Sequence, residues 1–247
     1  MESSVVIITG ASRGLGRAIA IELAEAGAHV VLAARDRDSL DAVAEVIRNQ
    51  SGLADVFPVN VGDLDGMQKL VDHTMELHGR IDVVINNAGI APQVPVDRMT
   101  DSEWDAVMEI NAGAVFRSAR AVAPIFRDTG HGRLINIASV FGLLGRSGFS
   151  AYGASKGASI NLSRVLAAEW AKFGAQVNAV APGYISTDIN VEMRENEAFM
   201  QRVLSRIPVK RMGEAHEVAN LVRYLALDAP DFLTGQVIAI DGGESAT

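Results

Sequence analysis

The sequence predicts a single α/β domain built on a doubly wound, seven-stranded parallel sheet. Short apolar runs rich in β-branched residues alternate with longer segments of helical period along the whole chain. The short runs are apolar on both faces, which is typical of parallel strands covered by helices on each side. No linker-like tract or internal repeat divides the 247 residues, so we expect one domain over residues 1–247.

The expected elements follow one another in a regular order. The apolar runs predict strands at 5–8, 29–34, 56–59, 82–85, 133–138, 176–181 and 236–240. Helical periodicity predicts helices at 14–26, 38–49, 63–78, 101–127, 151–173 and 214–227. The least regular stretch, 183–208, is expected to be a substrate lid, because ligands bind at the carboxyl ends of parallel strands. An ordinary pair of surface helices is the alternative.

Composition excludes several classes of function. A net charge of -8 argues against a nucleic-acid partner, and the absence of cysteine excludes disulfides and thiolate chemistry. No apolar run approaches the roughly 18 residues that span a bilayer, and the first residues do not resemble a signal peptide, so we expect a soluble cytoplasmic protein without a membrane partner. The five histidines show no metal-ligand spacing, and we expect no metal.

A glycine-rich turn joins the first expected strand to the first helix. Gly10, Gly14 and Gly16 leave the backbone bare there, so that a pyrophosphate group can approach the amides at the positive end of the helix. Glycines in such a turn can also be purely steric. Their position after the first strand favours a dinucleotide site that includes Ser12, Arg13 and Leu15.

The end of the second strand indicates which dinucleotide binds. The strand ends Ala34-Arg35, without the carboxylate that accepts hydrogen bonds from an adenosine ribose. Arg35 and Arg13 can instead close on a 2'-phosphate, which predicts NADP(H) over NAD(H). In the alternative interpretation both arginines are solvated surface charges and Asp36 contacts the ribose, although a carboxylate at 36 or 38 is equally suited to capping the next helix.

Tyr152 and Lys156 form a candidate acid/base pair. They lie four residues apart on one expected helix, so both side chains lie on one face and the ammonium favours the ionised phenol. Lowering the phenol pKa by about three units from ~10 requires roughly 4 kcal/mol of preferential interaction with phenolate.

Together these motifs resemble the single-domain short-chain dehydrogenase/reductase family, with its Rossmann-type fold. The resemblance covers nearly the whole chain: Thr9-Gly10-x-x-x-Gly14-x-Gly16, Asn86-Asn87-Ala88-Gly89, Asn111, Ser139, Tyr152-x-x-x-Lys156, and Pro182-Gly183 leading to Thr187. By chance alone, a YxxxK pattern is expected about 0.05 times in this chain.

The resemblance implies roles for four residues. Tyr152 would exchange a proton with the substrate oxygen, which Ser139 would also hold. Lys156 would bind the nicotinamide ribose and lower the pKa of Tyr152. Asn111 would hold a water that links Lys156 to solvent. Taken singly, Ser139 is better explained as a cap of a helix or turn and Asn111 as a tolerated helix irregularity, and only the four residues together in family order favour the catalytic roles.

The resemblance also implies residues that line the cofactor and the substrate. The cofactor would lie along Asn87, Ala88, Gly89, Pro182, Gly183, Ile185 and Thr187, with Asn60 and Val61 at the adenine. Asn60 departs from the aspartate common in the family. Candidate substrate residues at the strand ends are Gln93, Phe141, Leu144, Arg146, Phe149 and Tyr184, and Arg146 is suited to a substrate carboxylate.

The expected function is NADP(H)-dependent interconversion of a ketone and a secondary alcohol, on a small carbonyl or keto-sugar acid. The chain resembles the gluconate 5-dehydrogenase group and also the 3-oxoacyl-carrier-protein reductases, which are the alternative. Against the latter, the positions where carrier-protein enzymes place docking cations hold Gly130 and Phe173. A non-catalytic dinucleotide-binding regulator is disfavoured because Ser139, Tyr152 and Lys156 are all intact. The family commonly forms homotetramers through the two long helices.

Overall fold

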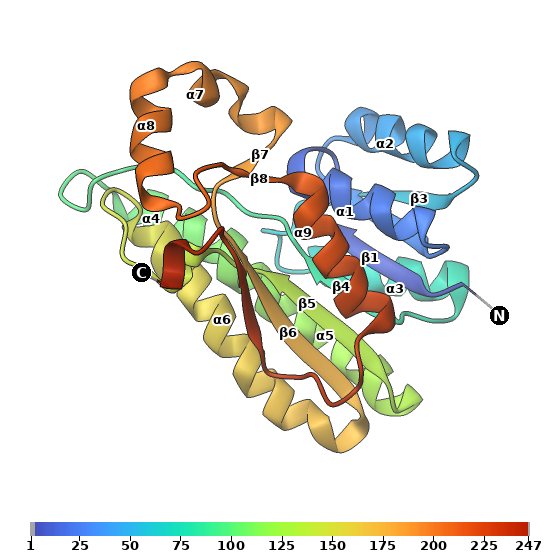
Figure 1. The fold of residues 1–247 in the computed structure, drawn as a ribbon. Coiled ribbons are helices and arrows are strands. Elements are labelled where there is room, and N and C mark those ends of the chain that lie inside the picture. The colour runs from blue at the N-terminus through green and yellow to red at the C-terminus, as the bar shows by residue number, and fades with distance from the viewer. Residues whose placement is uncertain (1–2, 247) are drawn as a thin grey trace.

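Seven parallel strands form one sheet, and helices cover both of its faces (Figure 1). The computed structural model describes residues 3–246, without the side chains of residues 192 and 193, so the first two residues and the last of the expected domain lie outside the described residues. In spatial order the strands are β3 (Leu53–Pro58), β2 (His29–Ala34), β1 (Val5–Thr9), β4 (Val83–Asn86), β5 (Gly132–Ile137), β6 (Ala175–Pro182) and β9 (Val237–Ile240). The order reverses between β1 and β4, which confirms the predicted doubly wound, Rossmann-type sheet.

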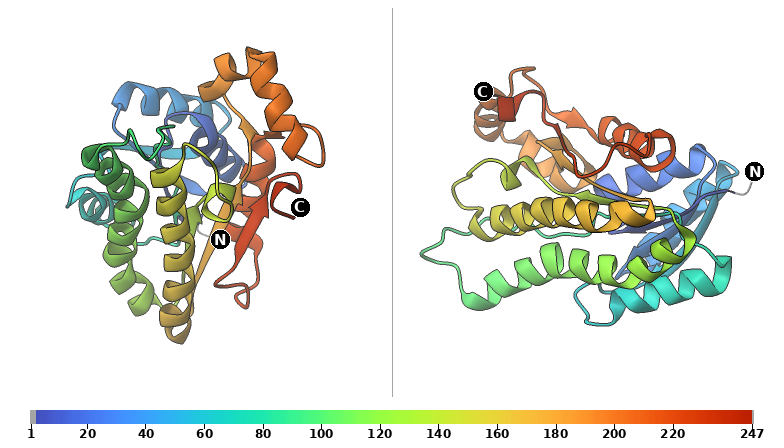
Figure 2. Two further views of the ribbon diagram at one scale, coloured as in Figure 1. Left: turned by 90° about the vertical axis from the view of Figure 1, so that its left-hand side faces the viewer. Right: turned by 90° about the horizontal axis from the view of Figure 1, so that it is seen from below.

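Two helical layers enclose the sheet (Figure 2). One contains α1 (Gly14–Glu25), α2 (Arg37–Asn49) and α9 (Ala215–Arg223), and the other contains α3 (Gly66–His78), α5 (Ala114–Thr129) and α6 (Ser150–Trp170). Alternate β1 residues point to opposite layers, with Val6 and Ile8 in one core and Val5 and Ile7 in the other. This two-sided burial explains why the strands appear as continuous apolar runs.

The segment predicted as one helix over 101–127 is two helices with a bulge between them. Helix α4 (Asp101–Met108) and α5 are joined by a π-helical turn, Glu109–Gly113. A second π turn, Tyr224–Asp228, follows α9 within the expected 214–227 helix. The sequence pattern of a helix is almost the same with or without a π turn of only five residues, so periodicity predicts continuous helix in both places. Such π turns are common at functional sites.

The irregular segment 183–208 rises from the carboxyl end of β6 (Figure 1). It contains β7 (Ile185–Ser186), a 3₁₀ turn at Asp188–Asn190, α7 (Val191–Glu195) and α8 (Glu197–Arg206). Strand β7 pairs with β8 (Gly213–Glu214), and Val203, Ile207 and Met212 form a small separate core beneath α8. A segment with its own small core, set apart from the main sheet, is suited to moving as a unit. Among the described residues, no helix has the length and apolar character to cross a bilayer.

Candidate active site

A cleft of 720 Å³ lies at the carboxyl ends of β1, β2 and β4, where the strand order reverses. Eleven of the predicted cofactor residues line it: Gly10, Ser12, Arg13, Leu15, Gly16, Arg35, Asn60, Val61, Asn87, Ala88 and Gly89. The cleft also has apolar walls from Ile90, Ile110 and Ile189, which no sequence motif singles out. The remaining predicted cofactor residues, Gly14, Tyr152, Lys156, Pro182, Gly183, Ile185 and Thr187, do not line this cleft.

The glycine turn is packed too closely for side chains. Gly10 has φ 67°, and a Cβ there would lie 2.9 Å from Ala88 Cα, while a Cβ at Gly16 would lie 2.2 Å from the Gly10 carbonyl oxygen. The Asn87 amide donates to the carbonyl oxygens of Thr9 and Gly10 at 3.0 and 3.2 Å. These contacts hold the backbone of β1 against the loop after β4, and they fix the floor of the cleft.

Thr9 is a structural residue of the site that sequence analysis did not single out. Its side-chain oxygen accepts hydrogen bonds from the backbone amides of Asn87 and Ala88, at 3.0 and 3.1 Å. Because Thr9 is almost fully buried, these two amides obtain the partner that buried donors require. The threonine that opens the glycine motif thus fixes the loop opposite it.

At the end of the cleft near Arg13 and Arg35, the two cations lack ion-pair partners among the described residues, whereas the nearby carboxylate of Asp36 has hydrogen-bond partners. Arg13 and Arg35 are both exposed at the cleft, and neither forms an ion pair within the described part of the chain. Asp36 is occupied: it caps α2, accepting from the Ser39 amide at 3.1 Å and from the Ser39 hydroxyl. Of the two roles considered for Asp36, the structure shows the capping role, which leaves the two guanidinium groups free to bind an anion.

The irregular segment reaches the start of α1 through one carboxylate. Asp188 accepts a hydrogen bond from the Gly14 amide at 2.9 Å, and Ile189 packs so closely that a Cβ at Gly14 would lie 2.5 Å from its Cδ1. The amide at the positive end of a helix is where a pyrophosphate oxygen binds in such folds. Asp188 therefore places a carboxylate where this fold places a phosphate.

Tyr152, Lys156 and Ser139 meet at the carboxyl end of β5. The Lys156 ammonium lies 5.8 Å from the centre of the Tyr152 ring, as expected for positions four apart on α6, and donates to the Ile137 carbonyl oxygen at 2.7 Å. Ser139 follows β5 directly; its hydroxyl oxygen accepts a hydrogen bond from the Phe141 amide at 3.2 Å, and the hydroxyl lies near enough to the Tyr152 phenol to lower the pKa of that phenol. The three side chains that the sequence placed 17 residues apart at most are thus brought into one site.

Burial dominates the ionisation of Tyr152 and Lys156. Burial raises the pKa of Tyr152 above 10.0, and the hydrogen bond from Ser139 lowers it only in part. Burial also lowers the pKa of Lys156 from 10.5 to about 8. Desolvation of the phenolate outweighs the favourable interactions here, and the lowering of the phenol pKa by Lys156 together with a bound nicotinamide stays a prediction. At neutral pH the phenol holds its proton.

Asn111 connects the π turn to this site. Its side chain, fully buried, accepts from the Ile90 amide at 2.9 Å and donates to the Ile90 carbonyl oxygen at 2.8 Å and to Ser155 Oγ at 3.0 Å. Ser159 donates to the Asn111 carbonyl oxygen. Asn111 therefore positions α6 against the loop after β4, and its relay of protons through water stays a prediction. Neither Ser155 nor Ser159 was anticipated from the sequence.

Gly89 allows this close approach. A Cβ at position 89 would lie 3.1 Å from Asn111 Oδ1 and 3.5 Å from the Lys156 ammonium. A side chain there would therefore crowd the space between the dinucleotide cleft and the acid/base pair. The two parts of the site are continuous because of this glycine.

The predicted substrate residues form an aromatic wall beside Tyr152. The Phe141 ring lies 5.1 Å from Phe149, 6.2 Å from Tyr152 and 5.8 Å from Tyr184, measured between ring centres. Among the other candidates, Gln93 lies near Gly148, the residue before Phe149, and Leu144 lies just after the 3₁₀ turn that carries Phe141. The wall is apolar and suits the carbon skeleton of a substrate.

Arg146 has a partner that the sequence did not reveal. Its guanidinium is ion-paired with Glu244 near the end of the chain and lies 5.1 Å from the centre of the Phe141 ring. The Glu244 carboxylate is almost fully buried. A substrate carboxylate would therefore compete with Glu244 for Arg146.

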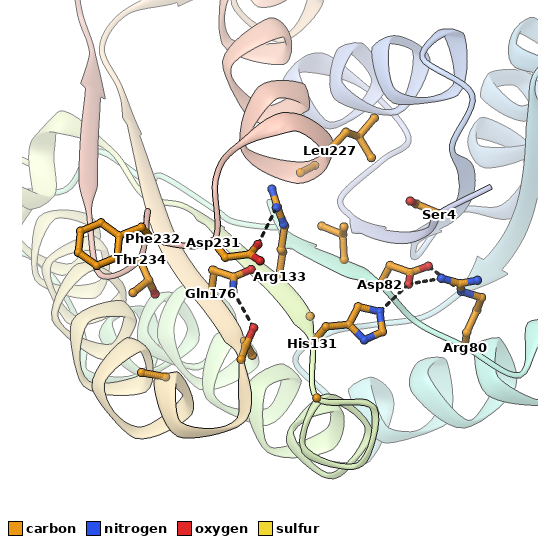
Figure 3. A pocket seen from close by; sticks show the side chains of 17 residues that line it. Ser4, Arg80, Asp82, His131, Arg133, Gln176, Leu227, Asp231, Phe232 and Thr234 are labelled. Atoms are coloured by element: carbon orange, nitrogen blue, oxygen red, sulfur yellow. Dashed lines mark hydrogen bonds and ion pairs between the residues drawn. The ribbon is translucent and has the colours of Figure 1, made fainter. Parts of the chain in front are cut away.

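A second cleft, of 940 Å³, lies at the opposite ends of the strands (Figure 3). Its charged groups pair with one another: Asp82 contacts Arg80 at 2.7 Å and His131 at 3.1 Å, and Arg133 contacts Asp231 at 3.3 Å. Although this cleft is larger, it lies at the amino ends of the parallel strands, and ligands in such sheets bind at the carboxyl ends. We assign the chemistry to the smaller cleft.

The fold and site together define a nicotinamide-dinucleotide oxidoreductase. The backbone amides of the glycine turn, the exposed guanidinium groups of Arg13 and Arg35, and the Lys156 ammonium suit the pyrophosphate, a phosphate and a ribose in turn. Tyr152 and Ser139 can then bind a carbonyl or hydroxyl oxygen next to the nicotinamide ring.

Comparison with known proteins agrees with this class. A family model described as enoyl-(acyl carrier protein) reductase matches residues 10–245. A 3-oxoacyl-[acyl-carrier-protein] reductase of Thermotoga maritima is 37% identical over 98% of both chains. Gluconate 5-dehydrogenase of Gluconobacter oxydans is 36% identical over 96% of this chain and 93% of its own.

A solved structure is equally similar. Gluconate 5-dehydrogenase from Burkholderia cenocepacia, in complex with NADP and tartrate, matches with a TM-score of 0.94 and 35% identity, over 100% of this chain and 97% of that one. The chain belongs to the short-chain dehydrogenase/reductase family, and it is an oxidoreductase acting on CH–OH groups.

Proposed function

We propose that this enzyme interconverts a ketone and a secondary alcohol, with NADP(H) as cofactor and Tyr152 as the general acid and base. The observation that carries the proposal is the meeting of Tyr152, Ser139 and Lys156 directly beside the dinucleotide cleft. The cofactor supplies or accepts the hydride when bound. The phenol exchanges the proton with the substrate oxygen, and the Ser139 hydroxyl donates a hydrogen bond to that oxygen.

The raised pKa of Tyr152 suits its role as the general acid of the reductive reaction at neutral pH. Reduction needs the protonated phenol, which is the form present, whereas oxidation needs the phenolate. Lys156 holds the other side of the site by donating to the Ile137 carbonyl oxygen. Its remaining hydrogens are available to the ribose hydroxyls.

Preference for NADP(H) over NAD(H) is supported by Arg13 and Arg35, which have no ion-pair partner in the described residues, and by the engagement of Asp36 with Ser39. A solved relative also contains NADP. We expect Arg35→Ala and Arg13→Ala each to raise the KM for NADPH about tenfold or more and to leave the KM for NADH nearly unchanged, because a lost charged hydrogen bond costs about 1.5–3 kcal/mol. Equal effects on both cofactors, measured in parallel titrations, would contradict the preference.

The substrate we propose is a free small carbonyl compound, a class that includes keto-sugar acids. The aromatic wall supports a compact carbon skeleton packed against Phe141 and Phe149, and the engagement of Arg146 with Glu244 disfavours dependence on a carboxylate. A relative is named gluconate 5-dehydrogenase, which keeps keto-sugar acids in the class.

The second candidate is reduction of a 3-oxoacyl group on an acyl carrier protein. It is favoured by the relative from Thermotoga maritima and by one contact: Arg127 lies 5.8 Å from the ring of Phe173, so a cation does reach the expected docking area. Against it stands the net charge of -8, which disfavours association with an acidic partner.

The deciding experiment compares substrates under one set of conditions. Purified enzyme with NADPH is offered small cyclic and linear ketones, keto-sugar acids and β-ketoacyl thioesters, free and on carrier protein, while oxidation of NADPH is followed by absorbance. Turnover of free ketones supports the first proposal, and a strong preference for carrier-bound thioesters supports the second. Tyr152→Phe should bind NADPH normally and lose turnover of every substrate by about 10²–10⁴-fold. A folded enzyme that binds NADPH and turns over none of these compounds would contradict both.

We also propose that the enzyme works in the cytoplasm as a homotetramer, with segment 183–208 closing over bound substrate as a lid. The tetramer is supported by large apolar side chains exposed on the helical layer that contains α5 and α6, including Phe116 and Val165. The lid is supported by the position of the segment at the carboxyl end of β6 and by its contact with Gly14 through Asp188.

A further inference from the structure

Two histidines and an aspartate that are remote in sequence converge at the open edge of the sheet. His29 begins β2, Asp55 lies in the edge strand β3, and His78 is the last residue of α3. Asp55 Oδ2 lies 2.7 Å from His29 Nε2 and 2.9 Å from His78 Nε2, and the three ligand atoms all lie within 4.8 Å of one another. We propose that these three side chains bind a borderline divalent cation of the zinc type, at a site separate from the active site.

The backbone aims all three side chains to one point. His29 and Val31 lie on the same face of β2, and Asp55 pairs in register with Val31, so both polar residues face the layer that contains α3. Helix α3 ends at His78 because Gly79 takes the left-handed conformation at φ 67°. The last turn of the helix therefore places His78 against the two strands.

The ligand set and spacing suit zinc. Two atoms bound to one tetrahedral zinc ion at about 2.0–2.2 Å lie roughly 3.3–3.5 Å apart, so the two contacts of Asp55, now 2.7 and 2.9 Å, would open by about half an ångström. Two imidazoles and one carboxylate match the preference of zinc, cobalt or nickel, whereas magnesium prefers oxygen ligands alone. The carboxylate and the negative end of the α3 dipole both favour a cation here.

The site is also reachable. The side chains of His29, Asp55 and His78 are 20%, 35% and 15% exposed, which admits an ion and leaves room for a water as fourth ligand. Hydrogen bonds within the cluster hold the ligands close together beforehand. Because the ion would join β2, β3 and α3, its effect should be on stability, and the active site at the other ends of the strands should be little affected.

The test is equilibrium dialysis of metal-stripped enzyme against Zn²⁺, with Co²⁺ as the spectroscopic probe. We expect one Zn²⁺ per chain at micromolar free metal, visible absorption of tetrahedral or five-coordinate Co²⁺, and a higher melting temperature with Zn²⁺. Mg²⁺ should not compete.

Matched variants identify the ligands. His78→Gln and Asp55→Asn should each weaken Zn²⁺ binding at least tenfold and abolish the Co²⁺ absorption, while NADPH binding shows that the variants remain folded. His73→Gln is the control, since His73 lies on the same helix and contacts Phe57 outside the cluster. The proposal is overturned if the wild type binds no Zn²⁺ under these conditions, or if the two ligand variants bind it as tightly as the His73→Gln control.

Discussion

At the scale of single residues, burial disfavours the charged forms of both members of the acid/base pair, the phenolate of Tyr152 and the ammonium of Lys156. The pKa of Tyr152 is raised and that of Lys156 is lowered to about 8, each because its charged form loses hydration. Ser139 works in the other direction, since its hydroxyl stabilises the phenolate. The residue pattern YxxxK predicts that the two groups are neighbours, but the pattern contains no information on how dry their surroundings are.

This ionisation predicts opposite pH dependences for the two directions of reaction. The phenol remains protonated through neutral pH, so the reductive rate should stay high there, while the oxidative rate should rise as the pH increases toward the raised pKa of Tyr152. Ser139→Ala removes the hydrogen bond that favours phenolate and should move the oxidative profile to still higher pH. Steady-state rates in both directions over a pH series test this, and an unshifted profile in Ser139→Ala would argue against the hydrogen bond.

Lys156 predicts a pH-dependent stability. Its pKa is about 8 in the folded enzyme and 10.5 as a free side chain, so between these values the unfolded chain binds more protons than the folded one. The free energy of unfolding should therefore rise with pH across this window, by up to about 3 kcal/mol, as the penalty for a buried ammonium disappears.

The variant Lys156→Met removes that titration. Urea unfolding at several pH values should show the wild type gaining stability relative to Lys156→Met between roughly pH 8 and 10.5. Lys172→Met, at an exposed position, serves as the control and should follow the wild type. Parallel curves for wild type and Lys156→Met would show that the lysine is not desolvated as the structure indicates.

At the scale of elements, the π turn between α4 and α5 positions Asn111 for three side-chain hydrogen bonds. A regular helix would rotate this side chain away from Ile90 and Ser155. We expect Asn111→Leu to lower the free energy of unfolding by about 2–4 kcal/mol, because buried donors and acceptors lose their partners. Denaturant unfolding measures this, and a loss below about 1 kcal/mol would mean that the network is dispensable.

The contact between the irregular segment and α1 gives an element-scale prediction about cofactor binding. Asp188 binds the Gly14 amide, so a phosphate arriving there meets a carboxylate. Asp188→Asn removes the negative charge and should tighten NADPH binding several-fold, as measured by fluorescence titration. Asp128→Asn, an exposed carboxylate at the far end of α5, is the control. Weaker binding by Asp188→Asn would show that the carboxylate instead helps to hold the cofactor.

At the scale of the whole molecule, the helical layer that contains α5 and α6 exposes large apolar side chains. Phe116 on α5 is 51% exposed and Val165 on α6 is 45% exposed. If these helices pack against other subunits, light scattering should give a tetramer, and Val165→Glu should reduce it to smaller species. Leu53→Glu, at an equally exposed apolar position on the edge strand β3, away from α5 and α6, should leave assembly unchanged. A monomeric wild-type enzyme would contradict the proposed homotetramer.

The sequence by itself determined the parallel sheet and the order of its elements, and it pointed to the candidate catalytic residues, because these depend on periodicity, glycine positions and side-chain chemistry, all of which are local. Tertiary structure decided what depends on pairs distant in the chain. These include the ion pair of Arg146 with Glu244, the hydrogen bond from the Gly14 amide to Asp188, and the contacts of His29 and His78 with Asp55. It also decided the ionisation of Tyr152, since desolvation is set by everything packed around a group and not by its neighbours in sequence.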